Sequence, residues 1–314
     1  MKWTKFLLLV LICTLFAACG KKKASKSEAD YNTIKIACDE TFSPIMGQEM
    51  RAFHAKYPEA IIDSVFLPET TAINQLLKDS IRMIIATRPL SEKEKSQIRD
   101  AYKLIAQCQP FAYDAVALIV NKNNSDTLIS VDEIRKIVTG KISQWSQIQH
   151  AKTKGNIEVV FDNENSSTVR YIRDSICGGS ELKGNLKTGH TNQEVIKYVS
   201  QTRNAIGIIG VDWIRNLKDS SKLSFDQRVH VMSVSNSAVT ESDNCFQPVQ
   251  YYIATGDYPL IRKLYVITTD PRDDARSLNF YYYLTDTEGQ LIITKSSQLL
   301  PIVPVQVKQV NVNP

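Results

Sequence analysis

Three consecutive hydroxyl residues, Ser166, Ser167 and Thr168, follow a short apolar run and a polar turn. The run, residues 158–161, is rich in β-branched and aromatic residues as strands are, and residues 162–165 are turn formers. The hydroxyl residues would then cap a helix, whose first turn has unpaired backbone N–H groups and partial positive charge. Such a turn can surround an oxyanion, although an ordinary capped helix has the same pattern.

The same residue types recur beyond other expected strands. Residues 33–38, 60–67 and 82–86 predict strands, and each is followed by a segment that predicts a helix. Successive strand–helix units form a parallel sheet that binds ligands beyond the carboxyl ends of its strands. Four threonines fall at those positions and together favour a binding edge: Thr41, Thr70, Thr71 and Thr87.

The chain beyond residue 103 predicts a second half of the molecule. An apolar run at residues 115–120 indicates a long strand that crosses into a second lobe. Ser130 and Glu133 have the spacing of a capping box, and Gly140 would end the helix that they open.

The N-terminus indicates export. Residues 1–18 combine two lysines with a short apolar core, which is typical of a cleaved signal peptide. The ending at residues 15–19 resembles a bacterial lipobox, so Cys19 is expected to carry lipid and residues 19–30 to form a flexible tether. A plain secretory signal without lipid is the alternative.

Composition excludes several classes of protein. The net charge is +5, and part of it comes from the signal and the tether. The sequence has no cluster of basic residues interleaved with aromatic residues, which argues against nucleic acid as a partner. The four histidines lack the spacing of metal ligands, and no metal or other cofactor is expected. The remaining cysteines are widely spaced and are expected to be buried thiols: Cys38, Cys108, Cys177 and Cys245.

An ordered set of segments carries a family resemblance, namely residues 84–94, 117–124, 131–145, 204–210 and 258–266. In the same order, these segments resemble those of the phosphate-binding proteins of bacterial phosphate ABC transporters. The resemblance implies an α/β fold of the two-lobed periplasmic-binding-protein type 2, with mostly parallel sheets flanked by helices. Lobe 1 would comprise residues 31–112 and 244–314, and lobe 2 residues 113–243, with the second crossing near residues 245–252.

The resemblance also assigns an anion site. Thr41 and Phe42 match the family's first ligand turn, and Thr70 or Thr71 matches its second. Ser166 and Thr168 match the serine and threonine of the lobe-2 turn, where Ser167 replaces a glycine but keeps the backbone N–H.

Two positions depart from the family pattern. Thr87 stands where the family has the acidic residue that accepts the proton of hydrogen phosphate, and Asp162 stands where it has an arginine. Arg88 or Arg170 could supply the missing positive charge. The missing acceptor could come from one of four carboxyl groups close to the expected loops: Asp39, Glu40, Glu69 or Asp162.

The expected function is that of an exported, monomeric lipoprotein, anchored to a bacterial membrane and facing the periplasm. It would capture phosphate or a related oxyanion in the cleft for the permease of an ABC transporter, and it would not be an enzyme. A binding protein of the same fold for another ligand is one alternative. A serine hydrolase using Ser166 or Ser167 is disfavoured, because the sequence has no Gly-x-Ser-x-Gly elbow and no histidine in a triad context.

Overall fold

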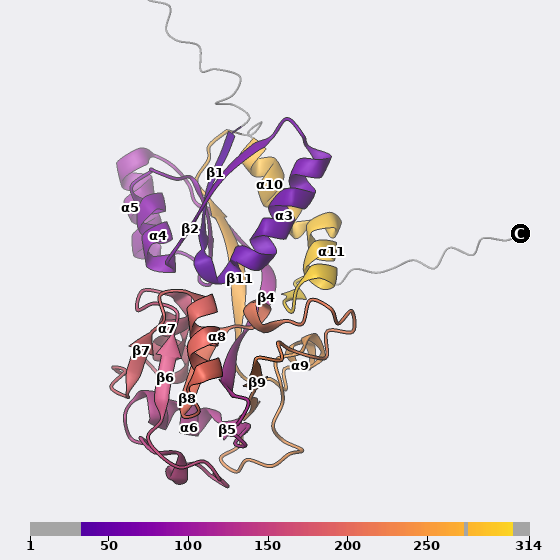
Figure 1. The fold of residues 1–314 in the computed structure, drawn as a ribbon. Helices are drawn as coiled ribbons and strands as arrows, with labels where there is room; N and C mark the ends of the chain where they lie inside the picture. Colours follow the sequence, from indigo (N-terminus) through magenta and orange to yellow (C-terminus); the bar gives the residue numbers. More distant parts are fainter. Residues whose placement is uncertain (1–32, 273–275, 304–314) are drawn as a thin grey trace, which may run out of the picture.

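The computed structural model describes residues 33–272 and 276–303 (Figure 1). The expected signal peptide (residues 1–18), Cys19 and the tether (residues 19–30) lie outside the described residues. So do residues 304–314. Within the described residues, no helix combines the length and apolar content that a membrane span requires.

The first lobe begins with a parallel sheet of order β2-β1-β3, formed by β1 (Thr33–Asp39), β2 (Ile61–Leu67) and β3 (Met83–Ala86). These strands confirm the three predicted from the sequence. Alternate residues of β1 supply two separate cores: Ile36 packs with the face covered by α3, and Ala37 with the face covered by α4. The helices of this part are α3 (Ser43–Lys56), α4 (Glu69–Leu77) and α5 (Glu92–Tyr102).

One strand joins the two lobes. β4 (Gln107–Asn121) runs from the upper to the lower body in Figure 1 without interruption. Its residues 107–115 pair with β11 (Ile261–Thr268), and from Val116 onward it pairs with β8 (Ala205–Gly210). The partner exchange at residues 115 and 116 therefore marks the point where the two lobes diverge.

The second lobe carries β8 beside β6 (Glu158–Phe161), with which it is parallel, and β7 (Leu186–Thr188) at the edge. Ser130 and Glu133 form both halves of the predicted capping box, and Gly140 adopts a φ of 80° just beyond the helix that they open. The other elements are β5 (Leu128–Ser130), β9 (Val229–Val231), β10 (Ser233–Ser235), α6 (Val131–Val138), α7 (Ser167–Tyr171) and α8 (Asn192–Gln201). In the sequence, α9 (Gln250–Thr255) follows between β10 and β11.

The chain returns to the first lobe through β11. It then forms α10 (Arg276–Thr285) and α11 (Thr287–Ser296), which lie on the α3 side of the sheet, and β12 (Leu300–Pro301), which pairs with β4 (Figure 1). The molecule is thus a two-lobed α/β fold with helices on the faces of mostly parallel sheets. The boundaries proposed at residues 112/113 and 243/244 stay predictions.

Candidate ligand-binding site

The turn that opens α7 has two kinds of hydroxyl. Ser166 is the predicted N-cap, since its side chain accepts a hydrogen bond from the Val169 N–H at 3.2 Å. The Thr168 hydroxyl is buried and has no partner. The α-helix that they start has only five residues before it continues as a π-helical turn, Ile172–Ile176. Any attraction of an anion to this turn is therefore expected to depend more on the side chains than on a helix macrodipole.

The turn after β1 lies against lobe 2. Thr41 is buried, its hydroxyl has no partner, and its N–H donates to Asp39 Oδ1 at 3.0 Å. Its carbonyl accepts from Trp213 Nε1 at 2.8 Å. A Cβ on Gly210 would come within 2.5 Å of the Thr41 methyl group, so only glycine allows this close approach between the lobes.

Arg262 reaches both turns, and the sequence reasoning did not include it. Its guanidinium carbon lies 5.2 Å from the centre of the Phe42 ring, and its Nη1 donates to Ser167 Oγ at 3.0 Å. Its Nε donates to Asp114 Oδ2 at 2.8 Å. The sequence contains a sign of this pair, because Arg262 and Asp114 are residues of opposite charge and each lies within an apolar segment that is typical of a buried strand.

Asp39 adds an ionisable group to the same place. Its carboxyl is buried, and Oδ2 has no partner. Burial raises its pKa to about 7 and the charge of Glu69 adds to the rise, whereas Arg262, the nearby Ser167 hydroxyl and the Thr41 N–H oppose it. Asp39 is therefore poised to change its protonation state near neutral pH.

Asp162, which follows β6, is also buried. It accepts a hydrogen bond of 3.4 Å from Asn192 Nδ2, and its Oδ1 has no partner. Burial raises its pKa, and Arg262 and the nearby Ser166 hydroxyl reverse this only in part. This position therefore supplies a buried carboxyl group rather than a positive charge.

Glu69, Thr87 and Arg170 form a contact across the lobes, which we call the rim clasp. The N–H and hydroxyl of Thr87 donate to Glu69 Oε1 at 2.6 and 2.8 Å. Arg170 donates to Glu69 Oε2 at 2.5 Å and to the Thr87 hydroxyl at 2.5 Å. Burial opposes ionisation of Glu69, but Arg170 outweighs it and the net shift of the Glu69 pKa is downward. Thr87 and Arg170 are therefore engaged with each other rather than with an open site.

Three further predicted residues lie outside the buried group. Arg88 forms a two-bond ion pair with Glu94 at 2.7 and 2.8 Å, at the start of α5. Thr70 is exposed and donates to the Asn165 carbonyl at 3.4 Å, which spans the two lobes. Thr71 is exposed. The structure thus brings together five of the predicted residues: Thr41, Phe42, Ser166, Ser167 and Thr168. Thr87 and Arg170 belong to the rim clasp, and Thr70, Thr71 and Arg88 lie outside the buried group.

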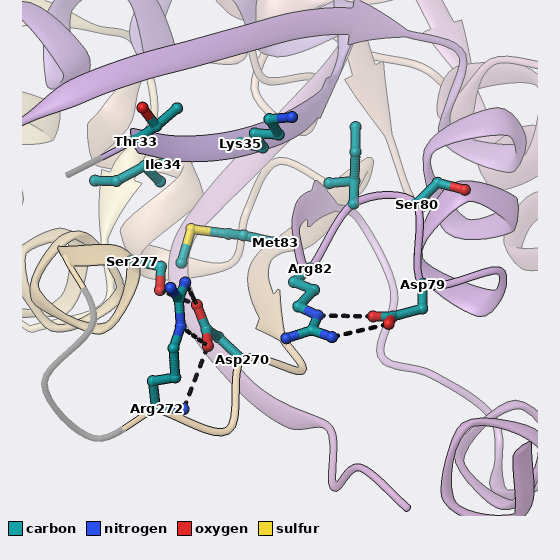
Figure 2. A pocket seen from close by; sticks show the side chains of 11 residues that line it. Thr33, Ile34, Lys35, Asp79, Ser80, Arg82, Met83, Asp270, Arg272 and Ser277 are labelled. Atoms are coloured by element: carbon teal, nitrogen blue, oxygen red, sulfur yellow. Dashed lines mark hydrogen bonds and ion pairs between the residues drawn. The ribbon is translucent and has the colours of Figure 1, made fainter. Parts of the chain in front are cut away.

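A separate polar cavity of about 250 Å³ lies at the opposite end of the lobe-1 sheet (Figure 2). Four of its charged groups form ion pairs with one another, since Arg82 contacts Asp79 at 2.8 Å and Arg272 contacts Asp270 at 2.7 Å. It adjoins the amino ends of β1 and β3 rather than their carboxyl ends. We therefore do not assign the ligand to this cavity.

The buried group combines hydrogen-bond donors, a positive charge and a titratable carboxyl, which are groups able to contact an oxyanion. Hydroxyls from both lobes, a guanidinium and a titratable carboxyl converge where β1 ends and α7 begins, joined by Arg262 and Ser167. Within residues 33–272 and 276–303, no cluster of His, Cys, Asp and Glu side chains has the composition of a metal site.

Comparison with known proteins gives the family. A model of the PBP superfamily domain matches residues 23–288. The phosphate-binding protein PstS of Borreliella burgdorferi is 23% identical over 283 residues, covering 87% of this chain and 92% of that protein. PstS of Bacillus subtilis is 23% identical over 322 residues, covering 98% and 97%.

Solved structures agree on the fold. A substrate-binding protein of Clostridium perfringens with bound phosphate aligns with a TM-score of 0.69 at 21% identity, over 87% of this chain and all of that one. An ABC-type phosphate transport receptor of Vibrio cholerae aligns with a TM-score of 0.64 at 20% identity, over 86% of this chain and all of that one. The family model covers most of the chain, and the fold and the relatives agree with it: this chain belongs to the PBP superfamily, with PstS proteins among its relatives.

Proposed function

We propose that this protein captures inorganic phosphate between its lobes and presents it to the permease of an ABC transporter. Two relatives, the phosphate-binding proteins PstS of Borreliella burgdorferi and Bacillus subtilis, align with 87% and 98% of the chain. The site offers what a protonated oxyanion needs, which is several donors and one acceptor.

One observation carries the proposal. Thr41 Oγ1 from lobe 1, Thr168 Oγ1 from lobe 2 and Asp39 Oδ2 are buried and have no hydrogen-bond partner among the residues that the structure describes. Leaving such groups unpaired costs about 1–3 kcal/mol each, so a ligand that satisfies all three is favoured. Hydrogen phosphate matches them, because it accepts bonds from hydroxyls and donates its own proton to a carboxylate.

The remaining predicted residues receive these roles in the proposal. Phe42 packs beneath the guanidinium, and the backbone of residues 166–168 supplies N–H groups to the ligand. The rim clasp and Thr70 hold the lobes together once the ligand is inside, because a ligand that contacts both lobes favours the closed arrangement. Thr71 and Arg88 have no ligand contact.

Isosteric removal of the two unpartnered hydroxyls tests the site. We expect Thr41→Val and Thr168→Val each to weaken phosphate binding by roughly 10- to 100-fold, the effect of losing a bond to a charged ligand. Isothermal titration calorimetry on the mature protein measures this. Thr269→Val is the matched control, since Thr269 also has a buried hydroxyl without a partner but follows β11 at the far end of the sheet.

Near-normal phosphate binding by both valine variants would reject the site, and no phosphate binding by the unaltered protein would reject the function. Thermal melts of each variant separate loss of binding from loss of folding.

The export and the anchor are part of the proposal. A signal peptide at residues 1–18 and lipid on Cys19 would hold the protein at a bacterial membrane, facing the periplasm, as a monomer that is not an enzyme. In the source bacterium, Cys19→Ser should move the full chain from the membrane fraction to the soluble fraction without changing its melting temperature. Unchanged membrane association of that variant would contradict lipid anchoring.

A second candidate is another ligand on the same fold. Four carboxyl groups, Asp39, Glu69, Asp114 and Asp162, are buried around two arginines, Arg170 and Arg262, which is a heavily acidic surrounding for a dianion. Competition experiments that compare the affinities of phosphate, arsenate, sulfate and phosphate monoesters distinguish the two candidates. A phosphate-binding protein requires inorganic phosphate to bind most tightly of the four.

A further inference from the structure

Arg262 is a buried arginine whose guanidinium is only partly hydrogen-bonded. The residue is 5% exposed, and two of its three nitrogens have partners, Nε with Asp114 and Nη1 with Ser167. Nη2 is buried and has no hydrogen-bond partner within residues 33–272 and 276–303. A buried N–H on a charged group costs more to leave unpaired than a neutral one, so this nitrogen indicates a missing acceptor.

The surroundings identify that acceptor as an anion. Arg262 contacts Phe42, which follows Thr41, and Ser167, which precedes Thr168, so it stands between the two unpartnered hydroxyls. Burial lowers the pKa of its guanidinium, but the carboxylates of Asp114 and Asp39 outweigh this, and the group stays charged.

The other two arginines suggested by the sequence are committed elsewhere. Arg88 is held by both oxygens of Glu94, and Arg170 is held by Glu69 and Thr87 in the rim clasp. Neither leaves a charge free for a ligand.

The position of Arg262 in the sheet is also distinctive. Arg262 is opposite Asp114 in the pairing of β11 with β4, one residue before Ala115, where the partner exchange of β4 begins. The backbone of Val116 is bonded to Leu260 at 2.9 Å. The guanidinium is therefore fixed at the hinge and keeps its place whichever way the lobes rotate.

We propose that Arg262 binds the charge of the ligand from the hinge, with Asp114 orienting its guanidinium, in place of an arginine carried by the lobe-2 turn. The proposal rests on phosphate as the ligand. If this is so, the Arg262 guanidinium is available to phosphate before the lobes close, because the hinge where Arg262 lies belongs to both lobes.

Two substitutions at this pair have effects of opposite sign. Arg262→Met removes the charge and should weaken phosphate binding at least about 100-fold, as expected for a buried charge contact. Asp114→Asn keeps an oxygen for Nε but removes the opposing negative charge, so phosphate binding should be equal to or up to about tenfold tighter than in the unaltered protein. If the pair were only a structural link of the hinge, both variants would lose affinity together.

Calorimetry with inorganic phosphate measures these effects, with melts to confirm folding. Arg82→Met is the matched control, because Arg82 has a 2.8 Å aspartate partner at the other end of lobe 1, and it should bind normally. If Arg262→Met does not fold, Arg262→Ala with added guanidinium replaces it: phosphate affinity should rise with millimolar guanidinium in that variant only.

The outcomes separate the two proposals. The role of Arg262 is overturned if the unaltered protein binds phosphate and a folded Arg262→Met binds it within threefold as tightly. It is also overturned if Asp114→Asn loses phosphate affinity together with Arg262→Met. Absence of phosphate binding by the unaltered protein overturns the function instead.

Discussion

Sulfate should bind this protein in mild acid, and its affinity should fall about tenfold for each pH unit above pH 7. Sulfate has no proton to share, so it can contact Asp39 only while Asp39 itself is protonated. The pKa of Asp39 is raised to about 7, so the proton is present below that pH and lost above it. Phosphate brings its own proton, and its affinity should stay level between about pH 7.5 and 9.

Asp39→Asn should remove this selectivity. The amide is uncharged at every pH, so sulfate should bind the variant equally at pH 6 and pH 9, and the preference for phosphate at high pH should disappear. Competition binding with the two anions across this range is the measurement. Asp63→Asn, on the exposed side of β2, is the control. Sulfate binding by the unaltered protein that does not depend on pH would contradict the role of Asp39.

Glu49→Gln should raise the stability of the protein strongly at alkaline pH. Glu49 lies on α3, is fully buried, and neither of its carboxyl oxygens has a hydrogen-bond partner. Burial raises its pKa to about 9, and the nearby Tyr283 hydroxyl offsets this only slightly. The folded protein therefore holds a proton on Glu49 that the unfolded chain releases above its ordinary pKa.

The sign follows from that difference. Below the ordinary pKa of 4.5 both states are protonated and there is no penalty. Between there and about pH 9 the free energy of unfolding should fall by up to about 1.4 kcal/mol per pH unit because of this group. Glutamine keeps the shape without ionising, so the variant should gain up to about 4 kcal/mol near pH 7.5. Denaturant melts from pH 5 to pH 9 measure this slope.

Glu92→Gln provides the comparison, since Glu92 is exposed on α5 and should leave the slope between pH 6 and pH 9 unchanged. Equal slopes for Glu49→Gln and the unaltered protein would show that Glu49 is not held protonated in the fold.

Much of the fold could be predicted because it follows local patterns. The strands of lobe 1 alternate with amphipathic helices, and the capping box at Ser130 depends on residues three positions apart. Ser166 was predicted as an N-cap for the same reason and is one. The π-helical turn after Tyr171 has no such local signal, so the shortness of α7 could not be predicted.

The site could be predicted only in part, because its partners come from distant parts of the chain. Thr41 and Thr168 were proposed from their places after strands and in the motif, and their part in binding stays a prediction. Asp39 was one of four carboxyls that the sequence left equivalent, and its burial beside Arg262 distinguishes it. The contact of Arg262 with Asp114 joins residues 148 positions apart, so no spacing rule reveals it.

The continuity of β4 limits how the molecule moves. Its residues 112–116 keep backbone pairs with β11, β12 or β8 on either side of the partner exchange, so no flexible loop separates the lobes along this strand. We therefore expect a rotation of the lobes to change the twist of β4 over several paired residues rather than to bend a loop between them.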